Sequence, residues 1–208
     1  MDNINEYFKL YKHMLLDAMN SVDAKVLESI YDQLFGFAYP ENDDDPYGAP
    51  TPVYVFGNGG SAAIASHFCA DFNKNIWQDT DFNMRAICLN DNMPTFSAIA
   101  NDSHYAYVFS QQLAMIKPNK GDIAIAISSS GNSANIINGL AAANKHSMKT
   151  IALVGFNGGS VKENNLADTI LHVNSNNYGV VEDTHMIILH ALIQKLRKDR
   201  SAVSNPKL

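Results

Sequence analysis

The chain has few of the features that mark specialised classes of protein. Its 208 residues include only two cysteines, no run of about 18 apolar residues, and fewer Lys and Arg (15) than Asp and Glu (21). Too few cysteines are present for a disulfide framework, and the apolar runs are too short for a membrane-spanning helix. The net charge of -6 argues against non-specific nucleic-acid binding, and the acidic N-terminus does not resemble a signal peptide. We therefore expect a cytoplasmic protein that binds neither nucleic acid nor membrane.

What the chain does contain is typical of a single globular domain. Hydrophobic residues make up 46% of it and charged residues 17%, and its length allows a sizeable core. No internal repeat divides it, so we expect one domain over residues 1–208. Cys69 and Cys88 fall in a helical and a strand-like stretch, where buried, reduced thiols are expected.

From Val53 onward, short apolar runs alternate with stretches of helical periodicity. This alternation predicts an α/β fold with a five-stranded parallel sheet covered on both faces by helices, within a core over residues 52–200. The expected strands are residues 53–56, 85–89, 122–127, 150–155 and 169–173. The expected helices are residues 61–76, 133–146 and 181–198, with further helical material before residue 115.

The segments outside this core have different patterns. Residues 4–20 show helical spacing, and Ser21 is predicted to cap a second helix that ends near residue 35. Residues 36–51 contain an acidic run and several prolines, which predict an exposed loop. A calcium site is the less favoured alternative for that loop, because the spaced ligands of an EF-hand are lacking. Residues 201–208 are expected to form a frayed tail.

Two polar turns each follow a predicted strand and precede a predicted helix. They are Gly57-Asn58-Gly59-Gly60-Ser61 and Ser128-Ser129-Ser130-Gly131-Asn132-Ser133. Hydroxyl groups and the free N–H groups of a helix start are donors that suit a phosphate. For the serine hexapeptide alone, an ordinary surface turn is an equal alternative. Because ligands bind beyond the carboxyl ends of parallel strands, the two turns together predict one pocket.

A nucleotide is not the expected ligand of these turns. The glycine-rich turn lacks the GxGxxG spacing of dinucleotide-binding folds, and no lysine followed by Ser or Thr completes a P-loop. The predicted phosphate therefore belongs to another class of molecule.

In their order and spacing, the two turns and four further stretches resemble the sugar isomerase (SIS) domain family and, within it, the phosphoheptose isomerases. The further stretches are His67-Phe68, residues 98–102, residues 155–159 and the helix from His185 to His190. The resemblance covers nearly the whole chain. It implies a flavodoxin-like five-stranded parallel sheet between helices. It also implies a homotetramer with sites at subunit interfaces, in which the helices of residues 1–35 serve assembly.

The resemblance also implies which residues bind the sugar phosphate. These are Asn58, Gly59, Gly60, Ser61, Asn101, Asp102, Ser128, Ser129, Ser130, Ser133 and Glu182. Two alternatives remain from the sequence itself. Gly59 and Gly60 could serve only the turn, and Asn101 with Asp102 could form only a helix-ending turn and cap.

Aldose–ketose isomerisation moves a proton between adjacent carbons through an enediol, so it requires a base and a proton donor. We expect Asp71 and His190 to fill these roles. His67 and Asp71 are four residues apart and so share one face of a helix. In the family, the positions of His67, Asp71, Glu182 and His190 hold histidine, glutamate, glutamine and histidine, which in many members also bind zinc. The chain thus departs from the family at Asp71 and Glu182.

These departures bear on both the metal and the substrate. Two imidazoles and two carboxylates suit Zn²⁺, so His67, Asp71, Glu182 and His190 are the expected ligands. On one uninterrupted helix, however, Glu182 and His190 would lie about 12 Å apart. Both residues can then bind one metal ion only if Glu182 lies outside the helix or comes from a neighbouring subunit.

The expected reaction converts sedoheptulose 7-phosphate to D-glycero-D-manno-heptose 7-phosphate, for activated-heptose and surface polysaccharide biosynthesis. Because Asp71 and Glu182 differ from the family pattern, another ketose phosphate is an alternative substrate. A non-catalytic sugar-phosphate-binding regulator of the same fold is the alternative of another class. The joint presence of His67, Asp71 and His190 favours the enzyme.

Overall fold

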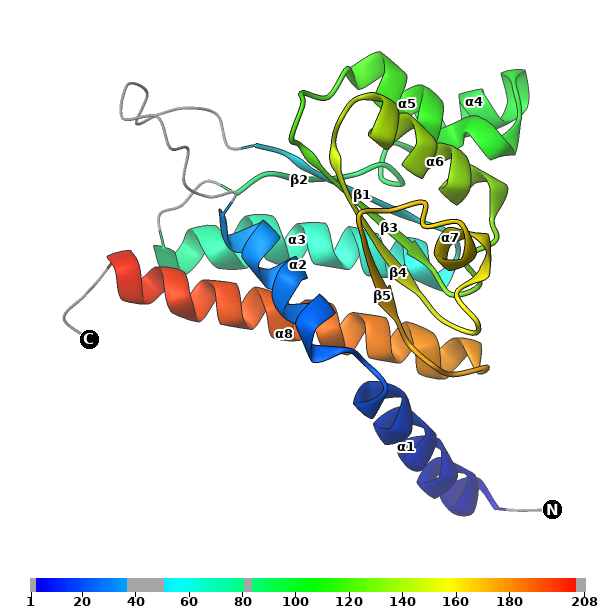
Figure 1. Ribbon diagram of the computed structural model, residues 1–208, viewed down its shortest axis with the longest axis vertical. Coiled ribbons are helices and arrows are strands. Elements are labelled where there is room, and N and C mark those ends of the chain that lie inside the picture. The colour runs from blue at the N-terminus through cyan, green and yellow to red at the C-terminus, as the bar shows by residue number, and fades with distance from the viewer. Residues whose placement is uncertain (1–2, 37–50, 81–83, 205–208) are drawn as a thin grey trace.

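The computed structural model describes residues 3–36, 51–80 and 84–204, and its centre is a five-stranded parallel sheet (Figure 1). The strands follow the order β2-β1-β3-β4-β5 and are β1 (Val53–Gly57), β2 (Ala86–Cys88), β3 (Ile123–Ser128), β4 (Lys149–Val154) and β5 (Thr169–His172). Every residue of β1 and β3 is buried, as expected for central strands covered on both faces. The predicted α/β fold class is confirmed.

Helices form one layer on each face of the sheet (Figure 1). The first layer holds α1 (Ile4–Asn20), α2 (Ala24–Gly36), α3 (Gly60–Thr80) and α8 (Tyr178–Ser204). The second holds α4 (Met93–Asp102), the 3-10 helix η1 (Tyr105–Tyr107), α5 (Val108–Ile116), α6 (Ala134–Lys145) and the short α7 (Gly159–Glu163). The long helices α3 and α8 pack side by side, which brings together side chains far apart in the sequence.

The strand order places a topological switch point between β1 and β3. These strands are direct neighbours, with Gly57 paired to Ile127, while the chain leaves β1 for β2 on the other side. In open parallel sheets, ligands bind at such a point, outside the carboxyl ends of the strands. Both predicted phosphate turns begin here, because one follows β1 and the other follows β3.

Several helix boundaries differ from the sequence prediction. Helix α2 begins at Ala24, and the Asp23 carboxylate accepts a hydrogen bond from the Lys25 amide. Ser21, predicted to cap α2, instead donates its hydroxyl to the Ala18 carbonyl at the end of α1, so that prediction was wrong. The predicted tail was also wrong at its start, because α8 continues through Ser204. After β4, residues 155–158 lead directly into α7.

The predicted acidic loop of residues 36–51 lies outside the described residues except at its two ends. Both cysteines are buried and free, as expected. Among the residues that the structure describes, no helix combines the length and the apolar character needed to cross a bilayer.

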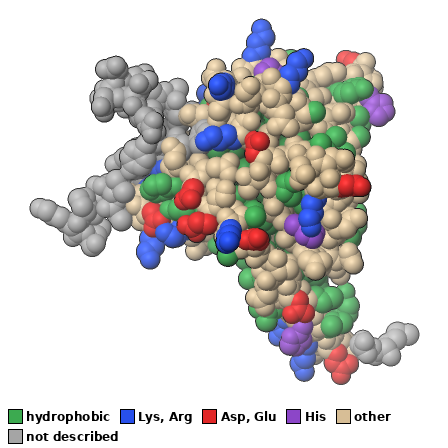
Figure 2. Space-filling model, viewed as in Figure 1, with side chains coloured by type: hydrophobic (Ala, Val, Ile, Leu, Met, Phe, Trp, Pro, Cys, Tyr) green, Lys and Arg blue, Asp and Glu red, His purple; other side chains and the backbone are tan. Residues whose placement is uncertain are grey.

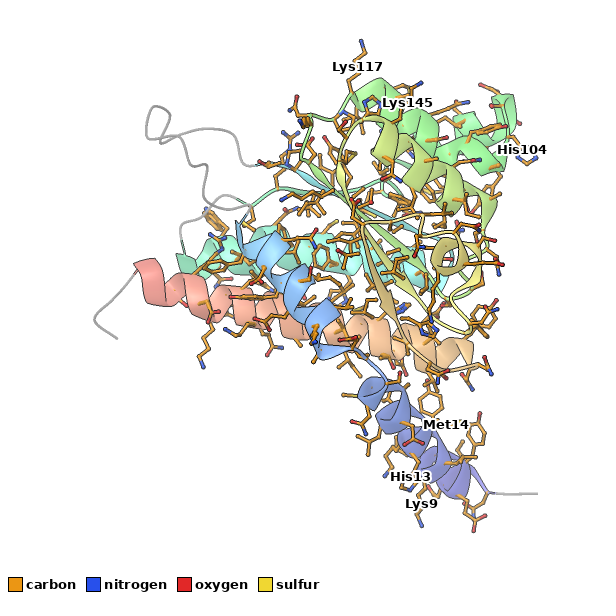
Figure 3. All side chains as sticks on the ribbon, in the orientation of Figure 1. Lys9, His13, Met14, His104, Lys117 and Lys145 are labelled. Atoms are coloured by element: carbon orange, nitrogen blue, oxygen red, sulfur yellow. The ribbon has the colours of Figure 1, made fainter. Side chains whose placement is uncertain are left out.

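Helix α1 extends away from the rest of the molecule (Figure 1). One of its faces packs on the core through Tyr11, Met14 and Leu15. Large apolar side chains also point outward, with Ile4 and Phe8 76% and 59% exposed, and Figure 2 shows hydrophobic side chains gathered on this projection. Lys9 and His13 lie on the same helix (Figure 3).

Candidate active site

The two polar turns are joined by a pair of side-chain amides. Asn58, in the turn after β1, donates to the Asn135 carbonyl oxygen at 2.9 Å, and Asn135 donates back to Asn58 at 2.8 Å. Asn135 is buried in the first turn of α6, directly after the serine turn. The prediction that both turns line one place in the fold is therefore consistent with this geometry. Asn135 did not stand out in the sequence, because an asparagine inside a helix has no distinctive pattern.

Two hydroxyl oxygens of the serine turn accept hydrogen bonds from the backbone of the turn itself. The hydroxyl oxygens of Ser128 and Ser130 accept hydrogen bonds from the Gly131 and Asn132 amides, at 3.2 and 3.3 Å. Each hydroxyl therefore keeps its proton for an external acceptor. Ser129 is buried and its hydroxyl has no partner in the described structure, while Ser133 begins α6 without a side-chain cap bond. These are the donors that a phosphate requires.

A third turn, after β4, supports the serine turn from behind. The Val161 amide donates to the Gly131 carbonyl at 3.1 Å, and the Gly155 amide donates to the Ser129 carbonyl at 2.9 Å. Gly131 has a positive φ of 64°, and a Cβ at this position would overlap the Gly158 carbonyl oxygen. Only glycine fits at position 131. Gly155 and Gly159 are restricted in the same way, because a Cβ there would overlap the Val181 side chain and the Ser130 carbonyl oxygen.

On the other turn, Gly59 is exposed with a φ of 55° and open space around it, while Ser61 is buried. Tyr105 of η1 donates its hydroxyl to the Asn58 carbonyl oxygen at 2.9 Å, although it is 48% exposed. Tyr105 was not predicted as a site residue, because no motif in the sequence marks it.

Asn101 and Asp102 end α4 and are exposed. Their side chains bond to each other, since the Asn101 side-chain amide donates to the Asp102 carboxylate at 2.8 Å. The described structure therefore supports the alternative of a helix-ending turn, and a contact with sugar hydroxyls remains a prediction for these two residues.

The predicted acid–base residues lie together between α3 and α8. Asp71 Oδ2 is 3.5 Å from His67 Nε2 and 3.6 Å from His190 Nε2. The two imidazole rings meet edge to face, with centroids 4.9 Å apart. Asp71 is partly buried, whereas about half of the His67 side chain is exposed. The cluster thus combines one carboxylate with two imidazoles at the protein surface.

A pocket of about 520 Å³ adjoins this cluster in the groove between α3 and α8. Asp71 and His190 line one part of it, and Arg197 and Lys198 line another part on the C-terminal half of α8. A substrate that reaches Asp71 and His190 therefore has space beside them and meets positive charge there.

Glu182 lies outside this cluster within one chain. Helix α8 is continuous from Tyr178 to Ser204, so the spacing of about 12 Å between Glu182 and His190 stands. The Glu182 carboxylate instead rests against Gly60, where a Cβ would overlap it. Gly60 begins α3, whose N-terminal dipole favours a negative charge. Burial, and then the charge of Asp183, raise the pKa of Glu182.

His67, Asp71 and His190 fit a zinc ion. Their donor atoms all lie within 4.8 Å of one another, and no other such cluster occurs among the described residues. Bonds of 2.0–2.1 Å in a tetrahedron place ligand atoms about 3.4 Å apart, close to the separations from Asp71. Two imidazoles and one carboxylate form a three-ligand set of the kind found in catalytic zinc sites.

His185 lies on α8 between Glu182 and His190 and is completely buried. Neither ring nitrogen makes a well-formed hydrogen bond in the described structure. Burial lowers the pKa of His185 to about 4, so the ring is neutral at pH 7. This side chain is part of the packing of α8 rather than a member of the cluster.

Comparison with known proteins places this geometry in a family. A model of the SIS domain matches residues 50–155. The chain is 40% identical over 141 residues to a probable phosphoheptose isomerase of Thermoplasma acidophilum, which covers 67% of this chain and 75% of that relative. It is 37% identical over 139 residues to the phosphoheptose isomerase of Colwellia psychrerythraea, which covers 66% of this chain and 70% of the relative.

A solved structure agrees with these sequences. The phosphoheptose isomerase of Francisella tularensis superimposes on this chain with a TM-score of 0.80 and 26% sequence identity, over 94% of this chain and 96% of the other. Both the sheet and the helices on its two faces are thus shared over nearly the full length. The chain belongs to the phosphoheptose isomerase family of SIS-domain proteins.

Proposed function

We propose that this protein isomerises sedoheptulose 7-phosphate to D-glycero-D-manno-heptose 7-phosphate. The observation that carries the proposal is the placement of Asp71 Oδ2 within 3.6 Å of two imidazoles, beside a pocket, in a chain related to phosphoheptose isomerases. We further propose a cytoplasmic location, as expected from the sequence composition, and a role in activated-heptose and surface polysaccharide biosynthesis, as the family resemblance implies.

In the proposed reaction, the serine turn binds the phosphate through the hydroxyls of Ser128, Ser129, Ser130 and Ser133 and the free amides at the start of α6. The phosphate fixes the sugar chain so that its first two carbons reach Asp71 and His190. One of these side chains removes the proton from one carbon, and the other protonates the neighbouring oxygen. The proton then returns to the adjacent carbon while the hydroxyl group on the first carbon gives up its proton, which forms the aldehyde and completes the isomerisation. Asn58, Gly59, Gly60 and Ser61 line the sugar phosphate, and Asn101 and Asp102 face its hydroxyls.

We propose that His67, Asp71 and His190 hold a zinc ion, with Glu182 of a neighbouring subunit as a further ligand. When bound, zinc supplies positive charge that polarises the oxygens of the reacting carbons. Asp71 and His190 are the groups of this chain that we propose move protons at the site.

We also propose that two chains share each site within a homotetramer. Gly60 and Asp71 are 11 residues apart on α3, or about 16 Å along the helix axis. An extended seven-carbon sugar phosphate is only about 10 Å long with bonds of roughly 1.5 Å. Within one chain, the glycine-rich turn at Gly60 and the Asp71 cluster are thus farther apart than one substrate is long, which supports a site shared between chains. The exposed apolar residues of α1 supply a surface for assembly.

The reaction is tested by incubating the purified protein with sedoheptulose 7-phosphate in deuterium oxide, with added zinc and with a chelator. We expect aldose formation with deuterium at C2, and a loss of both when zinc is removed. A panel of pentose, hexose and heptose phosphates separates a different ketose phosphate from the proposed one. If no sugar is turned over or labelled, the proposed isomerase is wrong, and the alternative of a non-catalytic sugar-phosphate-binding regulator remains.

The shared site is tested by mixing two inactive variants. We expect His190→Ala and the double variant Ser128→Ala/Ser129→Ala to regain activity when they are unfolded and refolded together, because each supplies the half that the other lacks. Each variant refolded alone serves as the control. A mixture no more active than its parents would mean that each chain forms its own site.

A further inference from the structure

Asn75 lies one helical turn after Asp71 on α3 and binds it directly. The Asn75 side-chain amide donates a hydrogen bond to Asp71 Oδ1 at 2.9 Å. Asn75 is half-buried and lines the same pocket as Asp71 and His190. It therefore lies next to the proposed reacting groups.

The two oxygens of the Asp71 carboxylate consequently have different partners. Oδ1 accepts from Asn75, whereas Oδ2 lies 3.5 and 3.6 Å from the two imidazoles. The terminal torsion of aspartate has broad energy wells, so its carboxylate turns easily when nothing holds it. A hydrogen bond to one oxygen fixes the plane of the carboxylate and with it the direction of the other oxygen.

This orientation matters more for aspartate than for a longer side chain. Asp71 stands where the family resemblance implies glutamate, and its carboxylate reaches about one methylene less far from the helix. A short side chain has fewer torsions with which to adjust toward a metal or a substrate. A neighbour that holds its carboxylate in the useful direction therefore has a larger effect.

We propose that Asn75 is a positioning residue, which holds Oδ1 so that Oδ2 of Asp71 faces His67, His190 and a zinc ion or substrate. The proposal rests on the proposed function, in which Asp71 carries a proton and binds metal. The alternative is a purely structural pair, since side chains at i and i+4 often bond along a helix surface. The two readings differ in what they predict for zinc binding and for turnover.

The test compares Asn75→Ala with Asn75→Gln, which retains an amide able to reach Asp71. The matched control is Gln78→Ala, an exposed residue on the same helix. In Asn75→Ala we expect zinc affinity, measured by competition with a chromogenic chelator, to fall about tenfold, as for other residues that orient metal ligands. We expect kcat to fall about tenfold with KM little changed. Asn75→Gln should restore most of both.

A double variant shows whether Asn75 acts through Asp71. In an Asp71→Ala background, which lacks the oxygen that Asn75 binds, Asn75→Ala should cause no further loss of kcat or zinc affinity. An equal loss in both backgrounds, or wild-type zinc affinity and kcat in Asn75→Ala, would overturn the proposal.

The zinc measurement separates this inference from the proposed function. If the wild type binds zinc but isomerises no sugar, the proposed function fails and the zinc affinities still decide the role of Asn75. If the wild type is active and Asn75→Ala matches it in both measurements, only the positioning role fails. A wild type that neither binds zinc nor isomerises any sugar overturns both.

Discussion

The two halves of the candidate site are built in different ways. The phosphate turns follow strands β1 and β3, and hydrogen bonds among local backbone groups and the Asn58–Asn135 pair hold their shape. The Asp71 cluster is held by the packing of α3 against α8, which brings Asp71 and His190 together although they are more than 100 positions apart in the sequence. The first half is suited to binding and the second to chemistry, so changes in each should affect different kinetic constants.

The largest expected effect separates chemistry from binding. Asp71→Asn keeps the size of the side chain but removes the proton acceptor, and loss of acid–base catalysis typically lowers kcat by about 10²–10⁴-fold. KM and the unfolding temperature should change little, because Asp71 is partly exposed and the phosphate turns are untouched. Steady-state kinetics with Asp17→Asn, an exposed carboxylate on α1, as the control would check this. A raised KM with unchanged kcat would assign Asp71 to binding instead.

The next effect concerns the backbone of the serine turn. In Gly131→Ala, the added Cβ overlaps the Gly158 carbonyl oxygen, and alanine must adopt the left-handed conformation that Gly131 has. Together these two effects should lower the free energy of unfolding by about 4 kcal/mol. Gly59→Ala is the matched variant, since Gly59 has a similar φ but open space, and its cost should be about 1 kcal/mol. Urea denaturation of both proteins measures the difference. Equal losses would show that the third turn does not constrain the serine turn.

A third prediction concerns His185, the buried residue of α8 that lies between Glu182 and His190. The pKa of His185 is about 4 in the folded state and near 6.5 when unfolded, so the unfolded chain binds the proton more tightly. Stability should be fully present above pH 6.5 and fall as the pH drops toward 4, by roughly 3 kcal/mol in total.

Unfolding of His185→Leu measured between pH 7 and 4.5 should lack this component of the pH dependence. His13→Gln provides the control, because His13 is exposed on α1 (Figure 3). If His185→Leu loses stability with falling pH as steeply as the wild type does, other groups are responsible.

The smallest expected effect tests binding alone. The Ser129 hydroxyl is buried without a partner in the described structure, so Ser129→Ala removes a donor to the phosphate without breaking a bond in the free protein. Loss of one such bond, about 1 kcal/mol, should raise KM roughly fivefold and leave kcat and stability unchanged. Ser110→Ala, on α5, is the control. A fall in kcat instead would mean that the two halves are not separable.

The difference between the two halves of the site also explains which features could be predicted from the sequence. The five strands lie within two residues of their predicted bounds, because strand burial and turn chemistry are local properties. The two turns were predicted for the same reason. Tyr105 and Asn135 were missed, since their roles depend on contacts made only after folding.

The helical half was less accessible to local reasoning. Only the spacing of His67 and Asp71 is a local signal, and the approach of His190 came from the family resemblance. Spacing along α8 correctly set Glu182 apart from His190, but its position against Gly60 could not be foreseen. Packing between distant elements decides such contacts, and one sequence carries no direct record of it.

The unbroken course of α8 limits how this chain can change in length. Each residue turns an α-helix by about 100°, so one inserted or deleted residue between Glu182 and His190 would rotate one of them away from its present neighbours. Loops elsewhere can grow or shrink without moving these groups. We therefore expect the segment from residue 182 to 190 to tolerate substitutions of its side chains but not insertions or deletions.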